Sequence, residues 1–203
     1  MKIFVTSDTH NSGFGDKFKI GKFDAIIHCG DITNLGVQNF PIFNALQSYI
    51  KLMGTPFYWI PGNHDLGLTQ DNFTGHCLLE RITMIKDKRV LGLSLSPCYN
   101  IPRLADYWDY MTADKKQEEN YYKNAPECDI LVSHCPPTGC DEMDTCEVSG
   151  TPNLGSEELR KYIERVQPEL VLCGHIHKSK PYERFIGKTR IINVATVSME
   201  IEI

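Results

Sequence analysis

Aspartate and histidine side chains end two apolar runs of this chain with a spacing that suits metal binding. The run IFVTSDTH ends with Asp8 and His10, and the run LVLCGHIH ends with His175 and His177. In an extended chain, residues two apart lie on one side, about 6.5 to 7 Å from each other. Each pair can therefore turn toward a common point, where carboxylate oxygens and imidazole nitrogens are ligands that divalent transition metals accept.

Three more apolar runs end with the same side-chain types. AIIHCGD ends with Asp31, WIPGNHD ends with Asn63, His64 and Asp65, and ILVSH ends with His134. Pro-Gly-Asn is also ordinary turn vocabulary, so one polar strand end alone would prove little. Five matched ends indicate one site.

Two histidines do not follow this pattern. His28 lies inside the apolar run that leads to Asp31, and His76 lies outside all five runs. We expect His28 to be a hydrogen-bonded core residue and His76 to be a surface residue, and neither to be a ligand.

The number of candidate ligands predicts more than one ion. Four histidines, two aspartates and one asparagine exceed what a tetrahedral zinc ion takes, but they suit two divalent ions that share one bridging carboxylate. Mixed nitrogen and oxygen ligands are compatible with Mn²⁺, Fe, Zn, Co or Ni, of which we expect Mn²⁺. The seven candidate metal ligands are Asp8, His10, Asp31, Asn63, His134, His175 and His177.

Alternating strand and helix patterns predict how these ends come together. Continuously apolar runs are typical of strands covered on both faces, and open α/β sheets bind ligands just beyond the carboxyl ends of their strands. We therefore predict a layered α/β protein with its sheets in the middle. Strands are predicted at 2–6, 24–29, 57–60, 82–85, 89–95, 129–133, 169–173 and 190–194, and helices at about 38–53, 113–124 and 156–166, the last with Ser156 as its N-cap.

A long segment without a predicted element begins at one candidate ligand. It reads HCPPTGCDEMDTCEVSGTPNLG, from His134 to Gly155, and a long loop in a compact domain is usually functional. Its acidic side chains are expected to repel extended polyanions and so to shape substrate choice. These are Asp141, Glu142, Asp144 and Glu147.

Composition bounds the class of protein. A length of 203 residues with 41% hydrophobic content predicts a single domain spanning 1–203. The net charge of −5 disfavours nonspecific duplex binding. No apolar stretch approaches the ~20 residues that span a bilayer, and no signal-peptide pattern is present, so we expect a cytoplasmic protein without a membrane partner.

The eight cysteines are expected to be reduced thiols. Cys29 and Cys173 lie inside strand-like runs, and a chain of this length does not need disulfides. Cys135, Cys140 and Cys146 lie closer together, but they lack the paired C-x-x-C spacing of a structural zinc site.

In type and order, the motifs resemble those of the calcineurin-like metallophosphoesterases. The resemblance covers D-x-H, G-D, G-N-H-D, a lone His and G-H-x-H over residues 3 to 194. More narrowly, SHCPPTG, GSEELRKYIERVQPELVLCGHIH and IGKTRIINV resemble segments of the small predicted phosphoesterases related to bacterial cyclic-AMP phosphodiesterases. After Asp31, Ile-Thr-Asn stands where the protein phosphatases of this superfamily have Asp-Arg, so protein dephosphorylation is not the expected activity.

The resemblance implies a fold and a division of the ligands. The fold is a four-layer α/β/β/α sandwich. One ion would take Asp8, His10 and His177, the other would take Asn63, His134 and His175, and Asp31 would bridge the two.

The expected chemistry is hydrolysis of a phosphomonoester or phosphodiester, with a small or nucleotide-like substrate. Two divalent ions would bring four positive charges, and Asp8, Asp31 and a bridging hydroxide would remove three, so the site would attract phosphate. The hydroxide would attack phosphorus while His64, oriented by Asp65 or by a backbone carbonyl, protonates the leaving alkoxide. A nuclease is the alternative and would show salt-dependent DNA binding; a non-catalytic scaffold of the same fold is the third interpretation.

Overall fold

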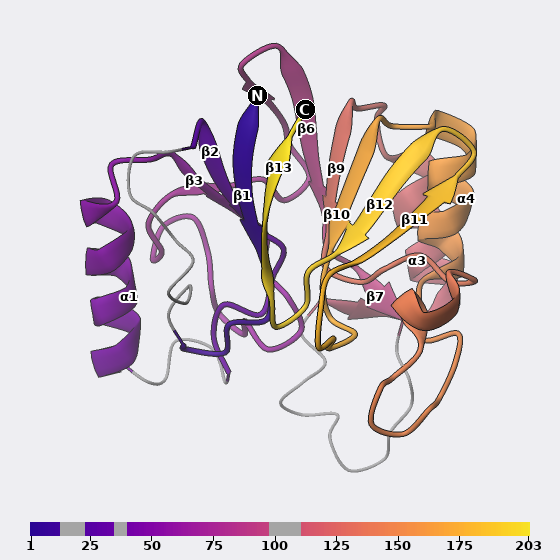
Figure 1. Ribbon diagram of the computed structural model, residues 1–203, viewed down its shortest axis with the longest axis horizontal. Coiled ribbons are helices and arrows are strands. Elements are labelled where there is room, and N and C mark those ends of the chain that lie inside the picture. The colour runs from indigo at the N-terminus through magenta and orange to yellow at the C-terminus, as the bar shows by residue number, and fades with distance from the viewer. Residues whose placement is uncertain (13–22, 35–39, 98–110) are drawn as a thin grey trace.

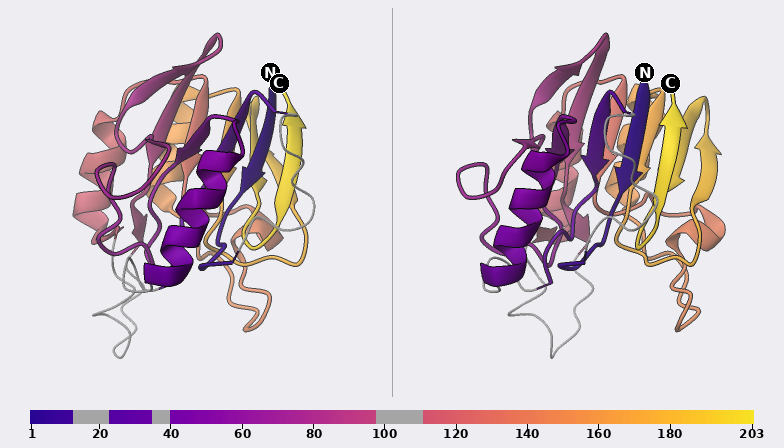
Figure 2. Two further views of the ribbon diagram at one scale, coloured as in Figure 1. Left: turned by 90° about the vertical axis from the view of Figure 1, so that its left-hand side faces the viewer. Right: turned by 60° about the vertical axis from the view of Figure 1, so that its left-hand side comes forward.

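Two β-sheets pack face to face with helices on both outer sides, which confirms the expected α/β/β/α sandwich (Figure 1). The structure is a computed structural model that describes residues 1–12, 23–34, 40–97 and 111–203. Figure 1 shows α1 on the left, the two sheets in the middle, and α3 and α4 on the right, and the turned views of Figure 2 show the same layers. Among the described residues, no helix has the length and apolar character needed to cross a bilayer.

Each sheet consists mainly of parallel strands with antiparallel strands at its margins. The first sheet has the order β13 (Ser198–Glu202), β1 (Lys2–Thr6), β2 (Ala25–His28), β3 (Phe57–Trp59) and β4 (His76–Cys77). The second has the order β11 (Tyr182–Ile186), β12 (Thr189–Asn193), β10 (Leu170–Cys173), β9 (Ile130–Ser133), β6 (Lys88–Leu93) and β5 (Ile82–Ile85). A short pair joins β7 (Ser96–Pro97) to β8 (Thr112–Ala113).

The helices cover the outer faces of the sheets. Helix α1 (Phe40–Leu52) lies on the first sheet, and α3 (Lys115–Asn124) and α4 (Glu157–Val166) lie on the second. A 3₁₀ turn, η1 (Asp141–Asp144), interrupts the segment that was expected to lack regular structure.

Three apolar layers follow from the alternation of side chains along the strands. Ile27 and Val132 belong to the layer between the two sheets, whereas Ile26 packs in the layer under α1. Leu131 packs with Tyr162 in the layer under α3 and α4. Because both faces of the central strands are covered, these strands are apolar throughout, as the sequence predicted.

All eight predicted strands are present, with ends that differ from the prediction by at most two residues. The strands that the sequence did not predict are of two kinds. β4, β7 and β8 span two residues each, too few to leave a pattern. β11 and β13 were missed because charged residues interrupt their apolar residues, Glu183 and Arg184 in β11 and Glu200 and Glu202 in β13, although Tyr182–Ile186 alternates in burial as an edge strand should.

The helix ends follow their caps. Asp114 caps α3 through a capping box with Gln117, so this helix begins at Lys115 and Ala113 belongs to β8. Ser156 caps α4 as predicted. Of the helix expected at 38–53, positions 38 and 39 lie outside the described residues.

The cysteines that the structure describes are free thiols, including Cys140 and Cys146. Cys98 lies outside the described residues.

Replacing Ser156 by alanine should destabilise the junction between α3 and α4. The Ser156 hydroxyl accepts the backbone N–H of Leu159 at 2.9 Å and donates to the buried carboxylate of Glu118. Losing the cap and leaving that carboxylate without its donor should together lower the free energy of unfolding by about 1 to 3 kcal/mol in denaturant titrations. Ser149→Ala in the exposed part of the 134–155 segment is the control, and an equal loss in both variants would contradict this role.

Candidate active site

The carboxyl ends of the parallel strands from both sheets meet at one edge of the molecule, the lower edge in Figure 1. Beyond the strand ends, Ser7 forms an isolated parallel bridge with Ala195, two residues after the end of β12 in the second sheet. The backbone N–H of His175 also donates to Asp8 Oδ2 at 3.0 Å. Side chains that are far apart in the sequence therefore converge where the two sheets touch.

The candidate ligands lie in turns rather than in extended chain. β1 ends at Thr6 and β10 at Cys173, so these candidate ligands lie beyond the strands, and the expected extended backbone at these residues is wrong. Asp8, His10, Asp31 and His175 have φ values of 56°, 44°, 55° and 66°. The left-handed region costs a non-glycine residue about 1 kcal/mol or more, and such strain is typical of functional sites.

Asp8, His10 and His177 form one group of possible ligands, with donor atoms within 4.8 Å of one another. His177 Nε2 lies 3.3 Å from Asp8 Oδ1 and 3.2 Å from His10 Nε2. Asp8 Oδ1 is buried, and its contact with His177 is an ion pair that lacks the geometry of a hydrogen bond. A cation between these two side chains would be bound by this carboxylate oxygen and the ring nitrogen.

Asp31, His134 and His175 form a second group, again within 4.8 Å. Asn63 completes it, because its Oδ1 lies 3.0 Å from His134 Nε2 and 2.9 Å from His175 Nδ1. The family resemblance implies a division in which Asn63, His134 and His175 hold one ion and Asp31 is shared by both ions.

Asp31 lies between the two groups. Its Oδ1 accepts the backbone N–H of His64 at 2.9 Å. Its Oδ2 lies 3.4 Å from His134 Nε2 in the second group and 3.9 Å from His10 Nε2 in the first. One oxygen is fixed by the protein and the other faces both groups, as a bridging ligand requires.

The donor set fits divalent transition metals. His134 Nδ1 lies 2.9 Å from the carbonyl oxygen of Cys29. A carbonyl oxygen can only accept a hydrogen bond, so Nδ1 carries the proton and donates it to this oxygen. In the neutral ring, Nε2 then offers its electron pair to the site. Carboxylate oxygens, an amide oxygen and imidazole nitrogens face one another here, and a cation would make this arrangement favourable.

When no ion is bound, protons on the histidines supply part of the positive charge that the carboxylates need. Burial alone would raise the pKa of Asp31, but the charge of His134 and its hydrogen bond hold that pKa below the usual value. Burial alone would lower the pKa of His134, but Asp31 raises it instead. Burial and the nearby His134 lower the pKa of His175 to about 4. A metal ion would therefore displace a proton from His134.

His64 stands beside these groups and points one ring nitrogen at them. Its Nδ1 lies 2.9 Å from the carbonyl oxygen of Asn34, so this nitrogen donates to that carbonyl. Its Nε2 lies 4.0 Å from Asp31 Oδ2. The ring is thereby oriented with Nε2 toward Asp31 Oδ2, the oxygen that faces both groups of donors.

Asp65 has a different role from the one considered for it. The backbone carbonyl of Asn34, not the Asp65 carboxylate, occupies the position of the partner of His64 Nδ1. The fully buried Asp65 carboxylate accepts the backbone N–H groups of Gly62, Ile32 and Thr33 at 2.8, 3.1 and 2.7 Å. Burial and the nearby Asp31 raise its pKa to about 6. Asp65 thus joins the Asp31 and Asn63 turns, and of the two partners expected for His64 the backbone carbonyl is the one observed.

The segment that follows His134 does not present four free acidic groups. Asp144 is buried and accepts backbone N–H groups of residues 139 and 140 at 2.8 and 3.1 Å. Arg184 pairs with Glu142, and the buried Lys178 donates to two carbonyls of the same segment. Asp144 is therefore not an exposed charge, Arg184 pairs with Asp141 and Glu142, and Glu147 accepts hydrogen bonds from Ser179. The repulsion of polyanions stays a prediction for the three exposed carboxylates.

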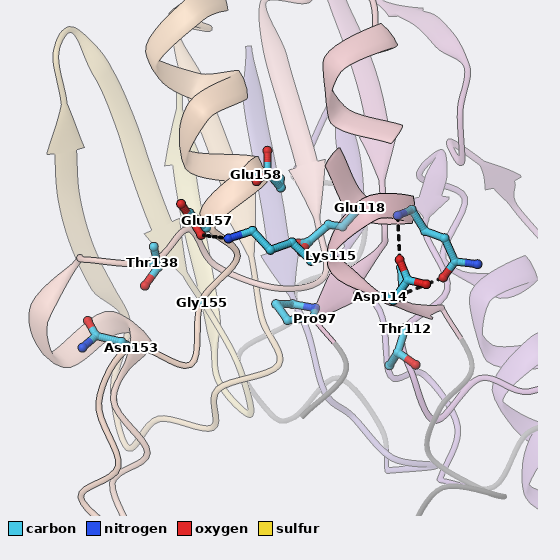
Figure 3. Close-up of a pocket in the computed structure, with 12 residues that line it drawn as sticks. Pro97, Thr112, Asp114, Lys115, Glu118, Thr138, Asn153, Gly155, Glu157 and Glu158 are labelled. Atoms are coloured by element: carbon cyan, nitrogen blue, oxygen red, sulfur yellow. Dashed lines mark hydrogen bonds and ion pairs between the residues drawn. The ribbon is translucent and has the colours of Figure 1, made fainter. Parts of the chain in front are cut away.

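A cavity of about 690 Å³ lies beside this segment, between the first turns of α3 and α4 (Figure 3). Lys115 and Glu157 form an ion pair of 3.1 Å there. The described residues that line the cavity include no candidate metal ligand. This cavity is therefore separate from the two groups of possible metal ligands.

Several groups that hold the site had no signal in the sequence. The carbonyls of Cys29 and Asn34 are main-chain groups, and any residue type could supply them. Thr33 is different, because its hydroxyl donates to Asp65 at 2.8 Å. A polar residue two positions after Asp31 could have been noted.

Replacing Gly62 by alanine should disrupt the bridging carboxylate. A Cβ at this position would lie 2.2 Å from Asp31 Oδ1 and 2.7 Å from His134 Cε1. Because both side chains must move, we expect calorimetric titration to show metal affinity at least tenfold weaker.

Gly54→Ala is the matched control. Gly54 has a φ of +67° and open space around the added Cβ, so this variant should lose about 1 kcal/mol of stability through backbone strain and keep its metal affinity. Unchanged metal affinity in Gly62→Ala would contradict the close approach on which the prediction depends.

Known proteins share the sequence pattern and the fold. The family described as calcineurin-like phosphoesterase matches residues 1–179. The UPF0046 protein K07C11.7 of Caenorhabditis elegans is 26% identical over an alignment that covers 96% of this chain and 69% of that protein. The 3′,5′-cyclic-nucleotide phosphodiesterase alr5338 of Nostoc sp. is 25% identical over 77% of this chain and 57% of its own length.

One solved structure illustrates the likeness of fold. The phosphopantetheinyl hydrolase of Mycobacterium tuberculosis superposes with a TM-score of 0.66 over 97% of this chain and 89% of its own, at 14% identity. The family match covers all but the last strands and includes each motif that supplies a candidate ligand. The chain therefore belongs to the calcineurin-like phosphoesterases and is a metal-dependent phosphoester hydrolase.

Proposed function

We propose that this protein is a dinuclear phosphoesterase that hydrolyses small, nucleotide-like phosphodiesters, with Mn²⁺ as its preferred ion. The observation that carries the proposal is the position of Asp31 Oδ2, which faces both groups of donor atoms. The similarity to a cyclic-nucleotide phosphodiesterase supports a diester over a monoester.

In this proposal, each ion has its own set of residues. Asp8, His10 and His177 hold one ion, Asn63, His134 and His175 hold the other, and Asp31 is shared. When bound, the two ions supply Lewis acidity toward the phosphoryl oxygens and lower the pKa of a water molecule in the site.

The protein supplies the proton that the leaving group needs. Protonated His64 holds that proton at Nε2, while Nδ1–H stays on the Asn34 carbonyl. Asp31 Oδ2 lies 4.0 Å from this nitrogen. Donation from Nε2 to the departing oxygen leaves a neutral ring still oriented by the same carbonyl.

Substrate choice tests the function directly. Metal-depleted protein should hydrolyse 3′,5′-cyclic AMP after Mn²⁺ is restored and should leave a single-stranded oligonucleotide intact. Cleavage of the oligonucleotide alone, with binding that weakens steeply with salt, would identify a nuclease instead. Bound ions without turnover of either substrate would identify a scaffold.

Replacing His64 by alanine should slow reactions in proportion to the basicity of the leaving group. The alkoxide released from a cyclic nucleotide needs a proton, whereas nitrophenolate departs readily without one. Steady-state kinetics should therefore show a loss of about 10² to 10⁴ with the alkyl ester and a much smaller loss with a nitrophenyl ester.

His76→Ala is the control for this experiment, since His76 is exposed on β4. The metal content of His64→Ala should match that of the wild type, because Asn63 rather than His64 is the proposed ligand. Loss of metal, or equal slowing of both esters when chemistry is rate-limiting, would exclude His64 as the acid.

A further inference from the structure

The two turns that carry Asp8, His10 and Asp31 run side by side beyond the ends of β1 and β2. The backbone N–H of Asp8 donates to the Gly30 carbonyl at 2.9 Å, and that of His10 donates to the Asp31 carbonyl at 3.0 Å. Both turns contain left-handed residues, so neither would keep this shape without support.

His28 supplies such support from the last position of β2. It is completely buried and lies on the side of the first sheet that faces α1, with its ring centroid 6.4 Å from that of Phe57. Burying an imidazole among apolar side chains costs desolvation. If His28 served only to pack the core, an aliphatic residue would fill the same space without this desolvation cost.

The hydrogen bonds of His28 have a defined direction. The backbone N–H of Gly30 donates to His28 Nδ1 at 3.2 Å, so the proton of the neutral ring is on Nε2. That N–H points at Thr9 Oγ1, which is 3.0 Å away. The Thr9 hydroxyl in turn donates to the Ile32 carbonyl at 3.3 Å.

This chain of hydrogen bonds ties one turn to the other. It begins at Gly30, passes through Thr9 between Asp8 and His10, and returns to Ile32 on the far side of Asp31. Burial lowers the pKa of His28 to about 3, so the ring keeps the neutral form that the chain needs.

We propose that His28 is a positioning residue of the metal centre, which fixes Asp8, His10 and Asp31 relative to one another through Thr9. The inference rests on the proposed function in one respect, that these three side chains hold metal. His28 itself contacts neither an ion nor a substrate.

The decisive test separates positioning from plain stability. Thr9→Val keeps the shape of the side chain and removes its hydroxyl, whereas Thr9→Ser keeps the hydroxyl. Calorimetric titration of the metal-depleted protein with Mn²⁺ should show affinity about 10- to 100-fold weaker for Thr9→Val and for His28→Phe. Thr9→Ser should bind as the wild type does.

The double variant tests whether the two residues act as one unit. His28→Phe combined with Thr9→Val should weaken metal binding no more than the worse single variant, because one broken link already interrupts the chain. Additive losses would contradict the relay through Thr9.

Thermal unfolding of the metal-free proteins is the second readout. Ser156→Ala should lower the melting temperature and leave metal affinity unchanged, since it lies outside both turns. If Thr9→Val and His28→Phe lower the melting temperature yet bind two ions as tightly as the wild type, His28 is only a core residue. A wild type that binds no metal would instead refute the proposed function.

Discussion

Electron-pair donors from two sheets face one another at a single edge of this molecule, and only a positive charge among them makes that arrangement favourable. Asp8 and Asp31 are almost wholly buried, where a carboxylate without a counter-charge is costly. In the metal-free form, protonated His134 supplies part of the counter-charge for these carboxylates. Two divalent ions would neutralise the carboxylates fully and would leave a net positive charge that attracts a phosphate group.

The layers of the fold bring these donors together. Parallel strands bring their carboxyl ends to a common edge, and the packing of two sheets brings two such edges together. The Cys29 carbonyl, at the end of the first sheet, receives the His134 N–H from the second. The same contact that joins the sheets also fixes the ring of a proposed ligand.

The geometry carries a cost in the backbone. Four of the seven candidate ligands adopt positive φ, and each would be more stable in an ordinary turn. Asp65 and His28 hold these turns by accepting backbone N–H groups. Buried polar residues near the site therefore compensate for strain that the chemistry requires.

Much of the site could be predicted from the sequence, because apolar runs and their polar ends mark both the strands and the ligands. Asp8 and His175 were identified by position alone, although they lie in left-handed turns rather than in extended chain. The partner of His64 could not be read, since the Asn34 carbonyl is a main-chain group that carries no residue signature. β11 and β13 escaped prediction because charged residues interrupt their short apolar stretches, whereas the equally exposed edge strand β5 is made of apolar residues and one threonine.

The role of the acidic segment also depended on tertiary contacts. Nothing in the run DEMDTCE indicates that Asp144 turns inward to accept backbone N–H groups. Arg184 and Lys178, which offset the remaining charge, come from a distant part of the sequence. Charge counts along a chain do not predict which charges face a substrate.

The most direct measurement is anomalous diffraction at the manganese edge from crystals grown with Mn²⁺. The account predicts two peaks about 3.5 to 4 Å apart, one contacting Asp8, His10 and His177, the other contacting Asn63, His134 and His175, with Asp31 touching both. A single peak at full metal loading, or two peaks that Asp31 does not share, would contradict it.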